Sequence, residues 1–180
     1  MFPQYQDIVF EELKKVFPDV EHFEVEYADL QKLEYLDRVL NETLRIIPPV
    51  PTVSRDLIEV IRLSNNVLVP KGVSFVVDIF HIHRNKEYWG PNAETFNPDN
   101  FLADNVRGRH PYAFLPFSKG RRNCIGWKYA LLLSKIALAK ILRNYRISTD
   151  FRYEDLVFID GVITKLRKSP LLRFQRRTSK

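Results

Sequence analysis

The only cysteine among the 180 residues, Cys124, lies in the segment FSKGRRNCIG, residues 117–126. Arg121 and Arg122 precede it, and an apolar segment with helical periodicity follows Gly126. A helix N-terminus exposes unpaired N–H groups and partial positive charge, and nearby arginines act in the same direction, so both favour thiolate over thiol. A thiolate in this position could ligate a metal or attack an electrophile.

These residues alone leave three alternatives open. A lone cysteine is most often a small buried hydrophobe. A cysteine nucleophile needs a histidine nearby in space, and nothing in the sequence orients His22, His81, His83 or His110 toward Cys124. A zinc site needs further Cys or His ligands at suitable spacing, and no cysteine pair supports the two histidines at 81 and 83. A single cysteine also excludes an intramolecular disulfide.

The net charge of +6 is unevenly distributed along the chain. Residues 1–90 carry 10 Lys and Arg against 15 Asp and Glu, whereas residues 91–180 carry 18 against 7. The basic half indicates an anionic partner, which could be nucleic acid, a membrane, an acidic protein or an anionic cofactor. The tail KLRKSPLLRFQRRTSK could bind nucleic acid on charge alone, but no known motif accompanies it, and no nucleic-acid partner is predicted.

Composition and periodicity predict one ordinary domain that is soluble as it stands. The chain is 45% hydrophobic and 28% charged, and no run approaches the length of a transmembrane helix or resembles a signal peptide. Helices are expected over residues 5–17, 29–47 and 126–145. Asp29 is the expected N-cap of the second. Short strands are expected over residues 50–55, 67–69 and 73–80, and after residue 145, with turns at Lys71-Gly72 and Asp160-Gly161. Residues 84–116 read as a long irregular loop.

The helix after the cysteine is predicted to be amphipathic and largely buried. Its apolar stripe comprises Trp127, Ala130, Leu131, Ser134, Ala137, Leu138, Ile141 and Leu142. Lys128, Lys135 and Lys140 lie off that stripe, so they are expected to face solvent.

Two motifs resemble those of a known family. Phe117, Gly120, Arg122, Cys124 and Gly126 match F-x-x-G-x-R-x-C-x-G, which resembles the haem-binding loop of the cytochromes P-450. The sequence ETLR, 82 residues upstream of the cysteine and just before a proline-rich stop, resembles the E-x-x-R of that family's K helix. The segments VPKGVSF, HIHRNKEYWGPNAETFNPDNF and GRHPYAFLPF follow in the family's order, in wording most like microsomal animal fatty-acid and insect hydroxylases.

The resemblance implies a role for each matched residue. Cys124 would be the axial thiolate ligand of the iron of haem b, iron protoporphyrin IX. Arg122 and Arg55 would contact the haem propionates, because arginine binds carboxylates bidentately. Phe117 would shield the sulfur. The implied cofactor-binding set is Cys124, Arg122, Arg55, Phe117, Gly120 and Gly126.

A second group of residues would support this loop. Glu42 and Arg45 are implied to form a buried ion pair that holds the loop from below, although an i, i+3 Glu/Arg pair is usually a solvated surface pair. The family usually has an arginine where FNPDNF has Asn100. Asparagine carries no charge, so the network is expected to be weaker here.

The implied fold class is mainly α with small β segments, as one partial domain over residues 1–180: the J and K helices, meander, Cys loop and L helix of the family's fold. The family's I helix, distal helices and N-terminal anchor have no counterpart in the sequence, so no catalytic, oxygen-activating residue is assigned. The sequence is therefore expected to be the C-terminal portion of such an enzyme.

The implied function is haem and iron binding by a monooxygenase that inserts one oxygen atom of O2 into an apolar small-molecule substrate. Electrons would come from a flavoprotein reductase, with cytochrome b5 as a further candidate. Lys119, Arg121, Lys128 and Lys135 form the predicted docking face, and ordinary solvated cations are the alternative. Location at the endoplasmic reticulum membrane follows from the resemblance alone. The alternative function is a catalytically incomplete haem-binding fragment without turnover.

Overall fold

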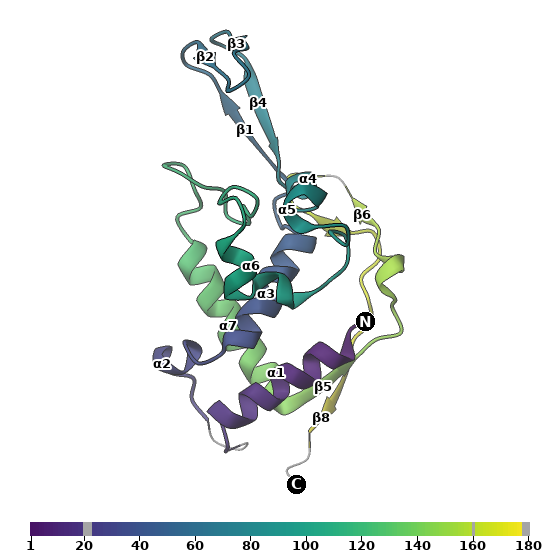
Figure 1. The fold of residues 1–180 in the computed structure, drawn as a ribbon. Coiled ribbons are helices and arrows are strands. Elements are labelled where there is room, and N and C mark those ends of the chain that lie inside the picture. Colours follow the sequence, from purple (N-terminus) through teal and green to yellow (C-terminus); the bar gives the residue numbers. More distant parts are fainter. Residues whose placement is uncertain (20–22, 160, 178–180) are drawn as a thin grey trace.

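Three helices form the body of the protein in a computed structural model that describes residues 1–19, 23–159 and 161–177 (Figure 1). They are α1 (Pro3–Val16), α3 (Glu34–Ile46) and α7 (Trp127–Asn144). The core between them and the short helix α2 consists of Val9, Leu13, Phe17, Leu30, Leu33, Leu36, Ala139 and Leu142. Burial of these apolar side chains is the main source of stability for this body.

The remaining elements are short. The other helical segments are α2 (Tyr27–Leu30), α4 (Ile79–Ile82), α5 (Lys86–Trp89), η1 (Pro98–Phe101), α6 (Ala103–Arg107) and η2 (Tyr153–Asp155). The strands are β1 (Thr52–Asp56), β2 (Ile61–Arg62), β3 (Leu68–Val69), β4 (Ser74–Asp78), β5 (Tyr145–Ser148), β6 (Phe158–Ile159), β7 (Lys165–Leu166) and β8 (Arg173–Arg176). Within the described residues they pair antiparallel as β1–β4, β2–β3, β5–β8 and β6–β7.

The predicted helix over residues 29–47 is wrong in its first part, because the chain forms two helices there. Asp29 is the third residue of α2, where its carboxylate accepts a hydrogen bond from the backbone N–H of Glu26. The longer helix α3 begins at Glu34 and is capped by another element. The Glu12 carboxylate of α1 accepts hydrogen bonds from the first-turn N–H groups of residues 35 and 36, at 2.6 and 3.0 Å. A cap supplied from another helix gives no local sequence signal.

The prediction for α7 is wrong at one lysine. Lys135 is buried, and its Nζ lies 2.8 Å from the Asp37 carboxylate of α3 and also donates to the Leu30 carbonyl. The predicted apolar stripe is only partly covered, since Trp127 and Ile141 are exposed. The helix therefore buries one face against α1, α2 and α3 and leaves apolar surface on another.

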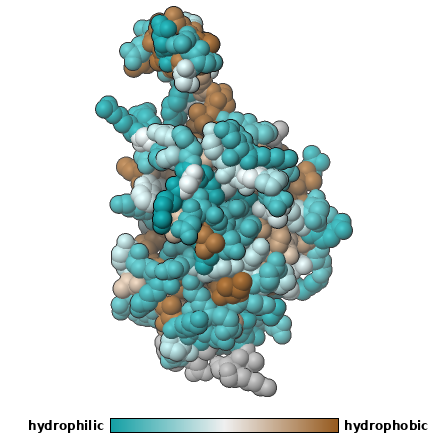
Figure 2. Space-filling model, in the orientation of Figure 1, coloured by the Kyte–Doolittle hydropathy of each residue, from teal (hydrophilic) through white to brown (hydrophobic). Residues whose placement is uncertain are grey.

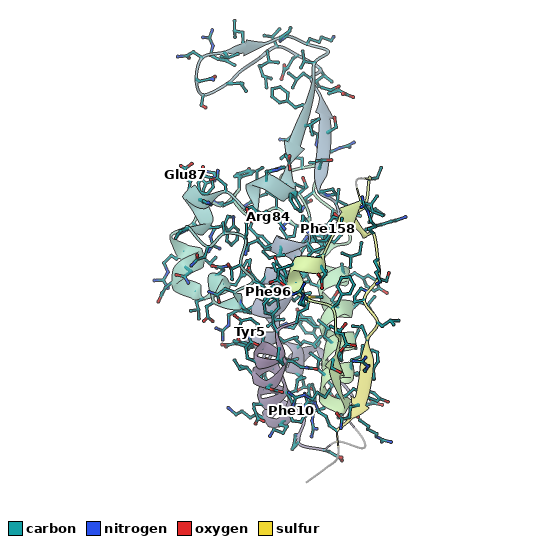
Figure 3. All side chains as sticks on the ribbon, turned by 90° about the vertical axis from the view of Figure 1, so that its right-hand side faces the viewer. Tyr5, Phe10, Arg84, Glu87, Phe96 and Phe158 are labelled. Carbon is teal, nitrogen blue, oxygen red and sulfur yellow. The ribbon has the colours of Figure 1, made fainter. Side chains whose placement is uncertain are left out.

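The hairpin of β1 and β4 projects away from the helical body, with β2 and β3 at its far end (Figures 1 and 3). Gly72 occupies a positive φ of 87° at the predicted turn, a backbone angle that glycine adopts without strain. Apolar residues appear among hydrophilic ones on this hairpin in Figure 2, and Ile58, Leu68 and Val76 are exposed there.

The expected irregular loop over residues 84–116 contains α5, η1 and α6 and is packed against the body. Phe96 stacks on Phe2, with ring centroids 5.0 Å apart, and its carbonyl accepts a hydrogen bond from the Tyr5 hydroxyl of α1 (Figure 3). The turn predicted at Asp160-Gly161 lies partly outside the described residues, because Asp160 is not among them; His22 is not among them either.

Candidate functional site

The segment before α7 is a tight loop closed by backbone hydrogen bonds. The N–H of Cys124 donates to the Phe117 carbonyl at 2.9 Å, and the N–H of Asn123 donates to the Gly120 carbonyl at 3.2 Å. Gly120 has a φ of 88° and Ser118 a φ of 60°, which is the left-handed region. Glycine at position 120 lets the chain reverse direction without strain.

The thiol of Cys124 is exposed, so it is not the buried hydrophobe that a lone cysteine usually is. It lies two residues before Gly126, the N-cap of α7, which has no side-chain cap. The first N–H groups of this long helix therefore favour negative charge beside the loop. Ile125 next to the thiol is fully exposed as well.

Within the described residues, neither of the other two uses of a cysteine finds support. No group of three or more His, Cys, Asp or Glu side chains is placed to hold a metal ion there. His81 bonds to Asp78 at 2.7 Å, and His110 lies beside two tyrosine rings. Both ring nitrogens of His83 are engaged elsewhere, so nothing orients it toward Cys124.

Arg55 and Arg122 are 67 residues apart in the sequence and meet at this loop. One Nη of Arg55, on β1, donates to the Arg122 carbonyl at 3.3 Å. Both side chains are exposed. The hairpin therefore brings a guanidinium to the loop that carries the thiol, and Arg121 and Arg122 add two more.

Glu42 and Arg45 form a bidentate ion pair near the end of α3, and neither side chain has any exposed surface. The carboxylate oxygens lie 2.7 Å from Nε and 2.7 Å from Nη2 of the guanidinium. The remaining guanidinium N–H groups donate to the backbone carbonyls of His83, Ala93 and Thr95. All five donors of Arg45 are thus satisfied, which is what allows a charge to be buried.

Asn100 contributes to this network without a charge. Its Nδ2 donates to the Glu42 carboxylate at 3.2 Å, and the N–H of Asn97 donates to the same oxygen at 2.7 Å. Arg109, which the sequence did not indicate, lies over the Trp89 ring at 3.7 Å and donates to the Asn100 carbonyl at 2.8 Å. Burial lowers the pKa of Arg109 from its ordinary value.

A comparison with protein families identifies the family to which the chain belongs. The family model described as cytochrome P-450 matches residues 2–171. The chain belongs to the cytochrome P-450 family. Its members bind haem as cofactor. The fold class expected from the resemblance, mainly α with small β segments from the C-terminal part of the P-450 fold, is confirmed.

Curated P-450 relatives from Drosophila melanogaster align along nearly the whole chain. "Probable cytochrome P-450 313a3" is 59% identical over 178 residues, which is 99% of this chain and 36% of the relative. "Probable cytochrome P-450 313a4" is 55% identical with the same coverage. "Cytochrome P-450 4g15" is 43% identical over 97% of this chain and 30% of its own length. The chain therefore spans about a third of the length of these P-450 relatives.

No helix in the described part of this P-450 chain is long and apolar enough to cross a membrane.

The predicted docking residues of the P-450 chain do not all share an exposed face. Lys119 and Lys128 are exposed beside the Tyr112 and Trp127 rings, at 5.0 and 5.5 Å from the ring centroids. Arg121 is exposed in the Cys loop. Lys135 does not belong to this face, because it is buried against α2 and α3.

The sequence did not indicate the environment of His83, which is buried near this P-450 loop. It has no exposed surface, and its ring lies 5.2 Å from that of Phe114. Desolvation by burial, reinforced by the charges of Arg45 and Arg84, lowers the pKa of His83 to about 4. The imidazole is therefore neutral near pH 7. The only sequence signal was its place in HIHRNKEYWG, which says nothing of its partners.

Proposed function

We propose that this chain carries the haem-ligand side of a monooxygenase, with Cys124 as the axial thiolate ligand of haem b. The observation that carries the proposal is the exposed thiol in a closed loop at the uncapped N-terminus of α7. When bound, a thiolate-ligated haem supplies the chemistry of O–O bond cleavage. The protein's part is to present one sulfur and to hold the cofactor in place.

The residues around the thiol fit such a cofactor. Arg55 and Arg122 offer guanidinium groups for the two propionates, which arginine recognises by paired hydrogen bonds. Phe117, at the start of the loop, is half-buried and is proposed to shield the sulfur once the cofactor is bound. Gly120 and Gly126 carry no side chain that would block the approach of a cofactor to the loop. A methyl group at Gly126 would lie 4.0 Å from the Cys124 sulfur.

The Glu42–Arg45 pair and Asn100 support the loop in this proposal. The pair is fully satisfied and fully buried, so it constrains geometry even where its net contribution to stability is small. The complete enzyme is proposed to oxidise an apolar small molecule at the endoplasmic reticulum membrane. The second candidate function is haem binding without turnover, which the coverage of only 36% of the relatives' length favours for the isolated chain.

The CO-binding spectrum of the reduced, haem-reconstituted protein tests the ligand. Thiolate-ligated ferrous haem gives its Soret band with CO at a longer wavelength than histidine- or thiol-ligated haem does. We expect the long-wavelength band in the native chain and its loss in Cys124→Ala. Arg122→Gln should weaken haem retention and leave the band position unchanged, with Arg62→Gln on the distant β2 as the matched control. Persistence of the band in Cys124→Ala would refute the assignment.

A flavoprotein reductase, with cytochrome b5 as a further candidate, is the proposed electron donor. Lys119, Arg121 and Lys128 are the exposed cations proposed to meet its acidic surface. Charge reversal at Lys128 should weaken reductase binding at low salt, whereas reversal at Lys71, on the distant hairpin, should not. Equal affinities of both variants would remove this face from the proposal.

A further inference from the structure

His83 connects the buried Glu42–Arg45 ion pair to the backbone segment that leads into the Cys124 loop. It caps the short helix α4 and has no exposed surface. Its Nε2 lies 2.7 Å from the backbone N of Leu115, and its Nδ1 lies 3.2 Å from the Arg45 carbonyl oxygen. Among the described residues, no other side chain hydrogen-bonds to the backbone of both Arg45 and Leu115.

The partners of His83 determine its tautomer. A backbone N–H can only donate, so Nε2 must be the accepting nitrogen toward Leu115. A backbone carbonyl can only accept, so Nδ1 must carry the proton toward Arg45. Only a neutral imidazole protonated on Nδ1 satisfies both contacts. The lowered pKa of His83 agrees with this state.

Both ends of this connection lead to residues of the proposed site. Leu115 lies two residues before Phe117, whose carbonyl accepts the N–H of Cys124 at 2.9 Å. At the other end, Arg45 returns a hydrogen bond from Nη1 to the carbonyl of His83 at 2.8 Å. A shift of the histidine ring would therefore move the start of the Cys loop relative to the ion pair.

We propose that His83 is a positioning residue for the Cys124 loop, holding the Leu115 amide through Nε2 and the end of α3 through Nδ1–H. The inference deepens the proposed function and rests on it for the meaning of the loop. Both ring nitrogens of His83 are engaged with backbone groups and not with the thiol, so its effect passes through the backbone of residues 115–117.

Two amide variants separate the two contacts of the ring. The amide of glutamine reaches about as far as Nε2 of histidine, so His83→Gln retains an acceptor for the Leu115 N–H. The shorter asparagine amide reaches only the position of Nδ1, so His83→Asn retains a donor to Arg45 and leaves the Leu115 N–H without a partner. Hydrogen exchange of the backbone amides of Leu115 and Cys124, measured without cofactor, is the first readout.

We expect exchange at both amides to be about tenfold faster in His83→Asn and close to native in His83→Gln, since one lost hydrogen bond exposes a buried donor. His110→Asn, at an exposed histidine, is the matched control and should leave both amides unchanged. Unchanged exchange in His83→Asn, or equal acceleration in both His83 variants, would overturn the proposal.

The CO-binding spectrum is the second readout, and it keeps the two proposals apart. With haem bound, His83→Asn should convert much of the long-wavelength band to the short-wavelength form, and His83→Gln should not. Equal spectra in both variants would overturn the positioning role and leave Cys124 as ligand. If the native protein lacks the long-wavelength band, the proposed function fails, and the exchange rates alone decide whether His83 positions the loop.

Discussion

Arg45→Lys is expected to be among the most destabilising conservative substitutions in this protein. The guanidinium makes two hydrogen bonds to the Glu42 carboxylate and three to the carbonyls of His83, Ala93 and Thr95. A lysine ammonium has three N–H groups and no planar fork, so at least two of these acceptors lose their donor. The site has no exposed surface through which water could replace it.

The size of the effect follows from these contacts. Hydrogen bonds to charged groups contribute about 1.5–3 kcal/mol each, so two lost bonds cost about 3–6 kcal/mol. Removing one partner of a buried ion pair altogether typically costs about 3–5 kcal/mol, a range that overlaps this one. Arg45 also lies 4.8 Å from the Trp89 ring centroid, a contact that lysine would keep only in part. A domain of ordinary stability, about 5–15 kcal/mol, would lose a large share of it.

Urea unfolding followed by circular dichroism measures this loss as a change in midpoint at constant slope. Arg38→Lys is the control on the same helix, because Arg38 pairs with the exposed Asp99 carboxylate at 3.3 Å and should cost under about 1 kcal/mol. The reasoning is refuted if Arg45→Lys costs less than about 1 kcal/mol or no more than the control.

Three further outcomes are expected in the same unfolding assay. Glu12→Ala, which removes the cap that α1 supplies to α3, should cost about 1–2 kcal/mol. Glu11→Ala, at an exposed position of α1, should cost little. Equal losses of stability in the two variants would contradict the cap. Lys135→Met should cost about 1–2 kcal/mol, because a buried carbonyl and a carboxylate lose their donor. The control Lys128→Met should change the stability by no more than about 0.5 kcal/mol. A larger loss in Lys128→Met than in Lys135→Met would contradict the buried position of Lys135. The pKa of His83 is lowered in the folded state to about 4 from an ordinary 6.5, so the unfolded chain takes up this proton first. The corresponding stability is fully present above pH 6.5, and about 3 kcal/mol of it is lost as the pH falls to about 4. His83→Gln should flatten this part of the plot of unfolding free energy against pH. An unchanged plot would contradict the lowered pKa of His83.

The local pattern was sufficient to place the motifs on their elements. FSKGRRNCIG was predicted to be a loop before a long helix, and α7 begins at Trp127, directly after it. The sequence ETLR was placed at the end of a helix, and α3 ends at Ile46, before the proline-rich stop. Both predictions rest on features that a short window contains: glycines, prolines and apolar residues at helical spacing.

The sequence did not reveal contacts between elements, because each depends on a partner far along the chain. Glu12 looked like any charged residue of an amphipathic helix until its carboxylate was found on the first turn of α3. The position of Lys135 relative to the apolar stripe predicts a solvent-facing side chain, yet α2 and α3 supply an acceptor and an opposite charge that make its burial possible.

By itself, the sequence determined the type, spacing and order of the residues that are proposed to bind a haem, because these are properties of the chain. Only the tertiary structure decided which of them meet. It brought Arg55 to the Cys124 loop through the β1–β4 hairpin and oriented His83, 32 residues before its partner, toward the Leu115 amide. Side chains so distant in sequence come together only when the helices and the hairpin have packed, and that packing is what fixes their geometry.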